Sequence, residues 1–163
     1  MKTDEIVKAI REQQLKTFEK RDYIDVLSEN EIRNLLLEKN YFYIKRDNEL
    51  LASCYIKPLV EKPKIYRLGG LSIKNSSFIA RKASVELLKK TQNYLVKYNI
   101  AFVVQTDTAS IESFLIDNGA KKISFEEGLV QYPLFIKAYI DDSVRSKEYF
   151  NSKIFYVREG NVL

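Results

Sequence analysis

The chain has 163 residues, of which 45% are apolar and 30% charged, which is the size and composition of one soluble domain over residues 1–163. It contains no histidine and a single cysteine, Cys54, so the sequence excludes an internal disulfide, a histidine-based catalytic triad and a histidine or thiolate metal site. We expect no metal. The net charge of +5 favours anionic partners, although many lysine-rich proteins do not bind nucleic acid.

No apolar run approaches the roughly 20 residues that a membrane helix needs. The N-terminal stretch MKTDEIVKAIREQQ is charged and has a helical pattern without a signal-peptide core. We therefore expect a cytoplasmic protein with no membrane partner.

The first half of the chain predicts two helices, a hairpin and a strand. A helix is expected over 3–20, with Ile6, Ala9, Ile10 and Leu15 on one side. A second helix follows Ser28, which forms a capping box with Glu31. Residues 41–56 predict a hairpin that turns at 46–48, and residues 64–73 predict a further strand.

The second half alternates strands and helices. A polar loop is expected to end at 81–84, and a helix to run from Ser84 to about Tyr98 with Val85, Leu88 and Leu95 on its apolar side. A buried strand, IAFVVQTD, precedes a short helix that ends at Asn118-Gly119, and AKKISFEE predicts another strand. PLFIKAYI and KIFYVRE are both strand-like. These last strands either complete the sheet or pair with a second subunit, so a homodimer stays open.

Three segments in this order resemble the GNAT superfamily of acyl-CoA-dependent N-acyltransferases over about residues 28–125. They are the strand YRLGGLSI, the helix SVELLKKTQNYLVKY with its paired Leu87-Leu88, and the segment VVQTDTASIESFLIDNGAKKI. The resemblance implies an α/β fold with a mixed, splayed central sheet of about six to seven strands flanked by helices. It also implies acetyl-CoA or another acyl-CoA as co-substrate and a small-molecule or macromolecular amine as acceptor.

The resemblance further implies which residues hold the cofactor. Backbone groups of Leu71 and Ile73 would pair with the amide-like pantetheine arm, as an added strand pairs with a sheet edge. The pyrophosphate would meet the start of the next helix at Arg81, Lys82, Ala83 and Ser84. The family's phosphate loop is rich in glycine, whereas this chain has Lys82 at the first glycine position. These cations either bind phosphate or form a solvated basic turn.

A second departure concerns the family tyrosine that often protonates the leaving thiolate. That position is Leu115 here, and the family's preceding asparagine corresponds to Thr108. Thr108 either contacts the cofactor or caps the helix that follows it.

Three side chains are candidates for catalysis. Asp107 follows a buried strand, where α/β sites tend to lie, and could act as a base. Tyr66 and Ser72 share one face of their strand, beside Gly69-Gly70, which leaves room for a ligand or a bulge. Each of these side chains also has an ordinary structural explanation, at a helix cap, a sheet margin or a turn.

The sequence leaves three functions open. The first is acyl transfer from acyl-CoA to an amine. The second is a GNAT-like protein without transferase activity that binds a protein or nucleic acid. The third is a nucleic-acid-modifying enzyme on the same scaffold, because eleven tyrosines and nine phenylalanines stand among many lysines. Aromatic residues in strands also serve the core, so this last pattern has two explanations.

Overall fold

A computed structural model describes residues 2–20, 25–107 and 109–160 of the chain. The described elements, in chain order, are α1 (Thr3–Lys20), α2 (Glu29–Leu37), β1 (Tyr41–Arg46), β2 (Glu49–Glu61), β3 (Lys64–Ile73), α3 (Phe78–Lys97), β4 (Phe102–Gln105), α4 (Ala109–Asp117), β5 (Lys121–Ser124), α5 (Phe125–Gln131), α6 (Pro133–Asp142), a 3-10 turn (Lys147–Phe150) and β6 (Ile154–Arg158). Over these described ranges the strands form one six-stranded sheet in the order β1-β2-β3-β4-β6-β5. The β3–β4 pair is parallel and the β1–β2, β4–β6 and β5–β6 pairs are antiparallel, which confirms the mixed α/β sheet.

The chain divides into two compact units. One comprises Met1–Lys57 and Gly69–Asn93, and the other comprises Pro58–Leu68 and Tyr94–Leu163. Strands β2 and β3 and helix α3 each contribute residues to both units. That residues 1–163 act as one domain stays a prediction.

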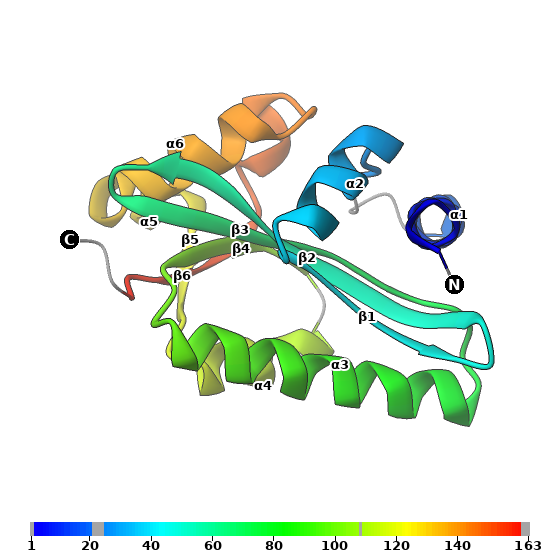
Figure 1. Cartoon of the computed structure of the whole chain (residues 1–163). Helices are drawn as coiled ribbons and strands as arrows, with labels where there is room; N and C mark the ends of the chain where they lie inside the picture. Colours follow the sequence, from blue (N-terminus) through cyan, green and yellow to red (C-terminus); the bar gives the residue numbers. More distant parts are fainter. Residues whose placement is uncertain (1, 21–24, 108, 161–163) are drawn as a thin grey trace. The chain divides into compact units, whose positions relative to one another are not determined.

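In the first unit, α1 and α2 cover one face of the sheet and α3 lies on the other (Figure 1). The helices over 3–20 and after Ser28 are confirmed, and both hydrogen bonds of the Ser28–Glu31 capping box form. The hairpin turn is shorter than expected, since only Asp47 and Asn48 leave the strands, with φ of 51° and 61°. The apolar residues buried between helices and sheet are Ile6, Val7, Ile10, Leu27, Ile32, Leu35, Tyr41, Leu50 and Tyr55.

Helix α1 buries two amides that hydrophobic periodicity did not single out. The side chains of Gln13 and Gln14 are 6% and 0% exposed, whereas Leu15, expected on the apolar side, is 38% exposed. Gln14 donates to the Tyr41 hydroxyl at 2.6 Å and accepts from the Leu27 backbone at 3.0 Å. These amides tie α1 to the strands with polar contacts as well as apolar ones.

Helix α3 begins six residues earlier than the sequence predicted. Its buried stripe has helical spacing and consists of Ala80, Ala83, Leu87, Thr91 and Leu95. Val85, expected on the apolar side, is 53% exposed, and Leu88 is half-buried. Alanines at the first two buried positions carried little hydrophobic signal, so the polar start of the helix looked like a loop.

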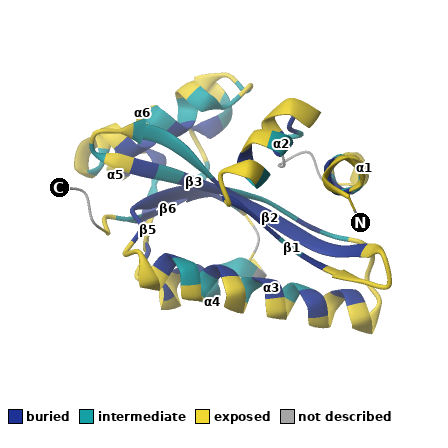
Figure 2. Cartoon of the chain, viewed as in Figure 1, coloured by how far each residue is buried: buried dark blue, intermediate teal, exposed yellow. Residues whose placement is uncertain are grey.

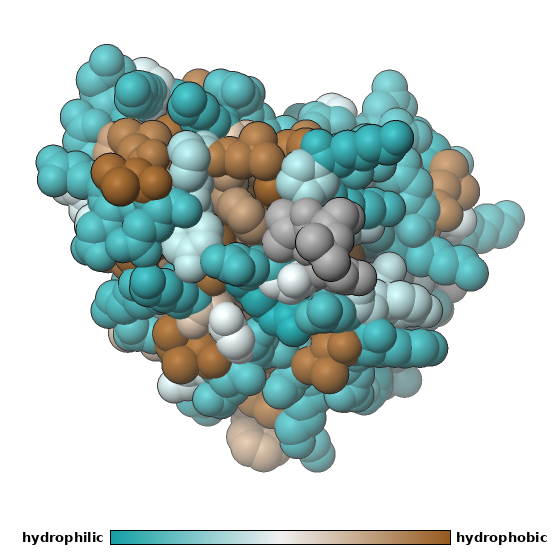
Figure 3. Space-filling view, turned by 90° about the vertical axis from the view of Figure 1, so that its left-hand side faces the viewer, coloured by the Kyte–Doolittle hydropathy of each residue, from teal (hydrophilic) through white to brown (hydrophobic). Residues whose placement is uncertain are grey.

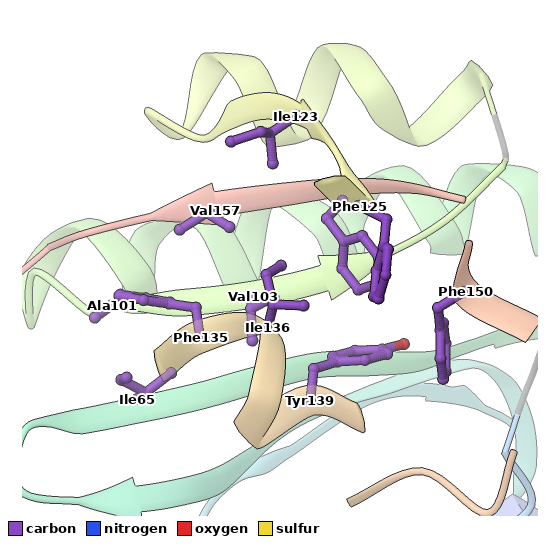
Figure 4. Close-up of a cluster of buried hydrophobic side chains, with 11 residues drawn as sticks. Ile65, Ala101, Val103, Ile123, Phe125, Phe135, Ile136, Tyr139, Phe150 and Val157 are labelled. Atoms are coloured by element: carbon purple, nitrogen blue, oxygen red, sulfur yellow. The ribbon is translucent and has the colours of Figure 1, made fainter. Parts of the chain in front are cut away.

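The second unit packs α5 and α6 against one face of its strands (Figure 4). Its core is rich in aromatic residues and consists of Ile65, Ala101, Val103, Ile123, Phe125, Phe135, Ile136, Tyr139, Phe150, Phe155 and Val157. The expectation of a strand at PLFIKAYI is wrong, because this segment is helix α6 with Pro133 at its first turn. The strand at KIFYVRE is confirmed as β6, which lies between β4 and β5 and so completes the sheet.

Burial follows these layers within each unit (Figure 2). All four residues of β4 are buried, as expected for a strand covered on both faces. None of the helices in the described ranges is long and apolar enough to cross a bilayer. Within residues 2–20, 25–107 and 109–160, no cluster of three or more Asp, Glu, Cys or His side chains could hold a metal.

Candidate functional site

Strand β3 changes its hydrogen-bonding direction once along its length. The N–H of Tyr66 donates to Ala101 in the turn before β4, and the N–H of Lys74 donates to Leu51 on β2. Eight residues separate these two groups, so a regular strand would point both to the same side. Gly70, with φ of +67°, is the β3 residue at which the backbone departs from strand geometry. It acts as a bulge.

This bulge determines which backbone groups of β3 face the edge opposite β2. Counting back from Lys74 in a regular strand, the N–H of Ser72 points toward β2, and those of Leu71 and Ile73 point to the opposite edge. The expectation that Gly69-Gly70 allows a bulge therefore agrees with the geometry. The expected room for a ligand is absent on the side of Tyr55, whose ring fills it.

The connection from β3 to α3 is a short turn that two hydrogen bonds to the side chains of Asn75 and Ser77 stabilise. The Asn75 side chain accepts from the Ser77 N–H at 2.9 Å, and the Ser77 hydroxyl accepts from the Ala80 N–H at 3.2 Å. Ser77 thus caps α3 in the usual manner of a serine at a helix start. The N–H groups of Phe78 and Ile79 have no acceptor within the helix, because the first turn of any helix lacks them.

The four residues expected to form a phosphate loop lie inside α3 instead, so that expectation is wrong in its local structure. Ala83 is 4% exposed, and the hydroxyl of Ser84 donates to the Arg81 carbonyl at 2.7 Å. Because their N–H groups belong to the helix interior, Ala83 and Ser84 cannot present backbone donors to a phosphate. The side chains of Arg81 and Lys82 are exposed and remain able to do so.

Ser72 lies in a buried polar network beneath α1. Its hydroxyl donates to the Gln13 side-chain oxygen at 3.0 Å and lies 3.2 Å from the Ser53 hydroxyl. Ser72 is 2% exposed and Ser53 is fully buried. The network satisfies these polar groups and gives Ser72 a structural explanation.

The other two catalytic candidates both belong to the second unit and lie apart. Tyr66 pairs with Phe102 at the start of β4, whereas Asp107 follows its end. The five residue steps from Phe102 to Asp107 span about 16 Å in extended chain. Asp107 accepts from Lys153 at 2.9 Å and from Gln105 at 3.2 Å. Thr108, expected at the cofactor or at a helix cap, lies outside the described residues.

A buried charge was missed by the sequence interpretation. Arg67 on β3 is 5% exposed, donates to Asp142 on α6 at 3.1 Å and has its guanidinium carbon 4.5 Å from the ring centre of Tyr139. An arginine inside an apolar strand is the one signal that could have shown it, because such a charge needs a partner. Its partner lies 75 residues away and could not be identified from the pattern.

Comparison with known proteins yields a shared fold. No family model matches the sequence, and no curated protein matches it. A solved structure of Rv2747 from Mycobacterium tuberculosis, in complex with CoA and one further ligand, superposes with a TM-score of 0.63 at 9% identity, covering 98% of this chain and 96% of that one. A GNAT-family acetyltransferase from Staphylococcus aureus Mu50 gives 0.57 at 15% identity, with 94% and 92% covered. Tetrahymena GCN5 gives 0.50 at 11% identity, with 94% and 87% covered.

The chain has the GNAT acetyltransferase fold. In these two comparisons the likeness covers 94–98% of this chain and 92–96% of the other. At 9–15% identity the likeness extends to the fold and leaves the substrate to be argued from residues.

Proposed function

We propose that the chain is an acyl-CoA-dependent N-acyltransferase that moves an acetyl or other acyl group to an amine. The observation that carries the proposal is the bulge at Gly70, which turns the N–H groups of Leu71 and Ile73 to the edge of β3 opposite β2. An edge of this kind can accept an amide-bearing chain as an added strand. The pantetheine arm of CoA is such a chain.

The start of α3 suits the phosphate end of the same ligand. The N–H groups of Phe78 and Ile79 and the positive end of the helix dipole would bind the pyrophosphate. Arg81 and Lys82, one turn later, carry exposed cations, and helical side chains lean back toward the N-terminus. Glycines are not required for this arrangement, since Ser77 already occupies the cap with a small side chain. The CoA in the Rv2747 complex supports CoA as the ligand class.

The proposed reaction requires no catalytic side chain. The amine nitrogen attacks the thioester carbonyl, the C–N bond forms, the C–S bond breaks, and the CoA sulfur leaves with the proton lost by nitrogen. A backbone N–H at Leu71 would donate to the developing oxyanion. The proposal assigns no side-chain base, because both oxygens of Asp107 accept hydrogen bonds, and Ser72 is bonded to Gln13. Before the attack, water would take the first proton from the ammonium form of the acceptor, and the sulfur receives the second.

Thermal unfolding with acetyl-CoA tests the proposal, with ATP as control. A ligand at 100 times its Kd stabilises a protein by about 2.7 kcal/mol, which for this size raises Tm by roughly 5–10 °C. Ser77→Asp keeps a capping side chain but places a negative charge where the pyrophosphate would bind. We expect this variant to fold and to lose the shift. Ser28→Asp, at the cap of α2, is the matched control and should keep the shift.

Release of the CoA thiol then measures transfer to a panel of amines. Thiol release that depends on both acetyl-CoA and the amine, and that falls in Ser77→Asp, is the expected result. An absent thermal shift at millimolar acetyl-CoA, or an unchanged shift in Ser77→Asp, would overturn the proposed cofactor site.

A second function is favoured by one observation at the same helix start. Phe78 and Ile79 are 72% and 62% exposed, and such an apolar pair fits a protein contact better than a phosphate. In this alternative the chain keeps the GNAT fold and binds a protein without acyl transfer. It predicts no stabilisation by any CoA compound, so the same melting experiment separates the two functions.

A further inference from the structure

Two hollows of the second unit adjoin each other, because Asn99 lines both. Their volumes are 390 Å³ and 410 Å³. The first lies beside the beginning of β3 and the end of α3. Their side-chain lining is aromatic and charged and includes Lys64, Tyr66, Tyr94 and Tyr98 in the first and Lys121, Tyr132, Arg158 and Glu159 in the second.

The rings offer stacking surfaces. Tyr98 is 54% exposed and its ring centre lies 4.7 Å from that of Tyr94. Tyr66 and Tyr132 are half-buried, each with one lysine over its ring, Lys64 at 5.5 Å and Lys121 at 6.0 Å. Burial raises the pKa of Tyr94 and of Tyr132, so these phenols stay neutral at physiological pH. Tyrosines held in this way bind planar rings with little loss of side-chain freedom.

Among the cations around these rings, Lys64 has one acid near it, since Glu61 adds to the rise in its pKa after the hydrogen bond with Tyr66. Over the described residues, Lys64, Lys97, Lys121 and Arg158 form no ion pair. Arg158 instead donates to the Ile100 carbonyl at 2.6 Å and to the Asn99 side chain at 2.9 Å.

Two of these lysines form hydrogen bonds with neutral side chains. Lys121 donates to Gln131 at 2.9 Å, and a hydrogen bond with Tyr66 raises the pKa of Lys64. Glu159 is the one carboxylate among the lining residues, and it raises the pKa of Tyr132 through a hydrogen bond. Three lining cations, Lys64, Lys121 and Arg158, against one lining acid make this surface attractive to an anion.

We propose that these two hollows bind a nucleobase together with its phosphate. Aromatic faces alone would suit any planar ligand, and cations alone would suit any acid. Their combination in two adjoining hollows suits bases joined by phosphates, as in single-stranded nucleic acid. Figure 3 shows hydrophilic side chains over most of the face that it draws, with hydrophobic ones in separate patches. The shared chemistry admits two sources, a free nucleotide and a single-stranded polynucleotide.

Fluorescence anisotropy of the full chain with a labelled 12-nucleotide single strand, as RNA and as DNA, tests the proposal. Tyr98→Ala should weaken binding by about 5- to 150-fold, since one base stacked on an aromatic ring contributes roughly 1–3 kcal/mol. Lys64→Gln should weaken binding and reduce the slope of log K against log salt by about 0.7. Phe18→Ala and Lys8→Gln, exposed positions on α1, are matched controls and should change neither. Displacement by millimolar AMP identifies a free nucleotide as the ligand, and displacement by unlabelled oligonucleotide alone identifies the polymer.

Three outcomes would overturn the proposal. They are no binding of either strand or of AMP at low salt, equal weakening in the α1 controls, and displacement by poly-glutamate as efficient as by oligonucleotide. The test is independent of the proposed acyl transfer, because Tyr98→Ala should keep the melting shift with acetyl-CoA. Release of the oligonucleotide by acetyl-CoA from the wild type but not from Ser77→Asp would instead place both ligands at the start of α3.

Discussion

The ring of Tyr55 fills the space that Gly70 leaves beside β3. A Cβ atom at Gly70 would lie 2.4 Å from Cε1 of Tyr55, closer than any real contact, and the residue has φ of +67°. Gly70→Ala must therefore both strain the backbone and displace a ring that is 1% exposed. We expect a loss of about 2–4 kcal/mol in the free energy of unfolding, measured by urea denaturation.

Gly119→Ala is the matched control for this prediction. Gly119 also has a positive φ, of +83°, but its Cβ would meet the Arg158 side chain at an ordinary distance of 3.4 Å. Only the strain of an alanine at positive φ then applies, and we expect a loss of about 1 kcal/mol in the free energy of unfolding. Equal losses in the two variants would show that the Tyr55 ring yields easily and that the bulge is not held by packing.

For the pair Arg67–Asp142, we expect a single substitution to lower the free energy of unfolding more than the double substitution does. Arg67→Met leaves the carboxylate of Asp142, which is 18% exposed, without its guanidinium partner and should cost about 3 kcal/mol. Arg67→Met combined with Asp142→Leu should recover most of that loss, because no buried charge remains. Urea denaturation of the four proteins gives the coupling energy, and simple additivity would contradict a direct pair.

The thiol of Cys54 predicts a pH dependence at the alkaline end. Burial raises the pKa of Cys54 to about 11. The unfolded thiol ionises at lower pH than the folded one, so its contribution to stability is constant below about pH 9 and declines between about pH 9 and 11. Cys54→Ser keeps a group that can contact Thr91 and removes this titration.

We expect wild type to lose about 1–3 kcal/mol more than Cys54→Ser across that window, followed by urea denaturation at fixed ionic strength. Burial also raises the pKa of Tyr41, and the charge of Cys54 adds to that rise, so the difference between the two proteins reports the thiol together with its coupling to Tyr41. Parallel stability curves for the two proteins would show that the thiol is not desolvated. Rapid reaction of the native thiol with a disulfide reagent at pH 8 would point the same way.

The pH dependence of transfer follows from the absence of histidine. With water as the base, kcat/KM should rise with pH as the alkyl ammonium, with an ordinary pKa near 10.4, loses its proton. The slope should be close to one per pH unit from about pH 6 to 9. A plateau beginning near pH 7 with an alkylamine acceptor would reveal an enzyme base and contradict this mechanism.

Elements with a strong local signal were predictable from the sequence. The capping box of α2 and the ten-residue strand β3 appear as expected. Each is determined by residues that lie close together in the sequence. The apolar run PLFIKAYI fits both a strand and a buried helix, and Pro133, favourable at a helix start, decides for α6.

The candidate site depended on relations that no local rule contains. The buried position of Ser72 follows from Gln13, 59 residues away. The edge that Leu71 faces follows from a single glycine conformation. The start of α3 follows from Ser77, whose role as a cap was hidden within a run of polar residues.

The glutamines of α1 have a practical consequence for handling the protein. A shortened version that begins after Lys20 would remove the acceptor of the Ser72 and Ser53 hydroxyls and the donor to Tyr41, and would open the first unit's apolar core to water. Such a fragment should aggregate when it is expressed. Helix α1 is therefore a structural layer of the first unit, and crystallisation or labelling schemes should leave it intact.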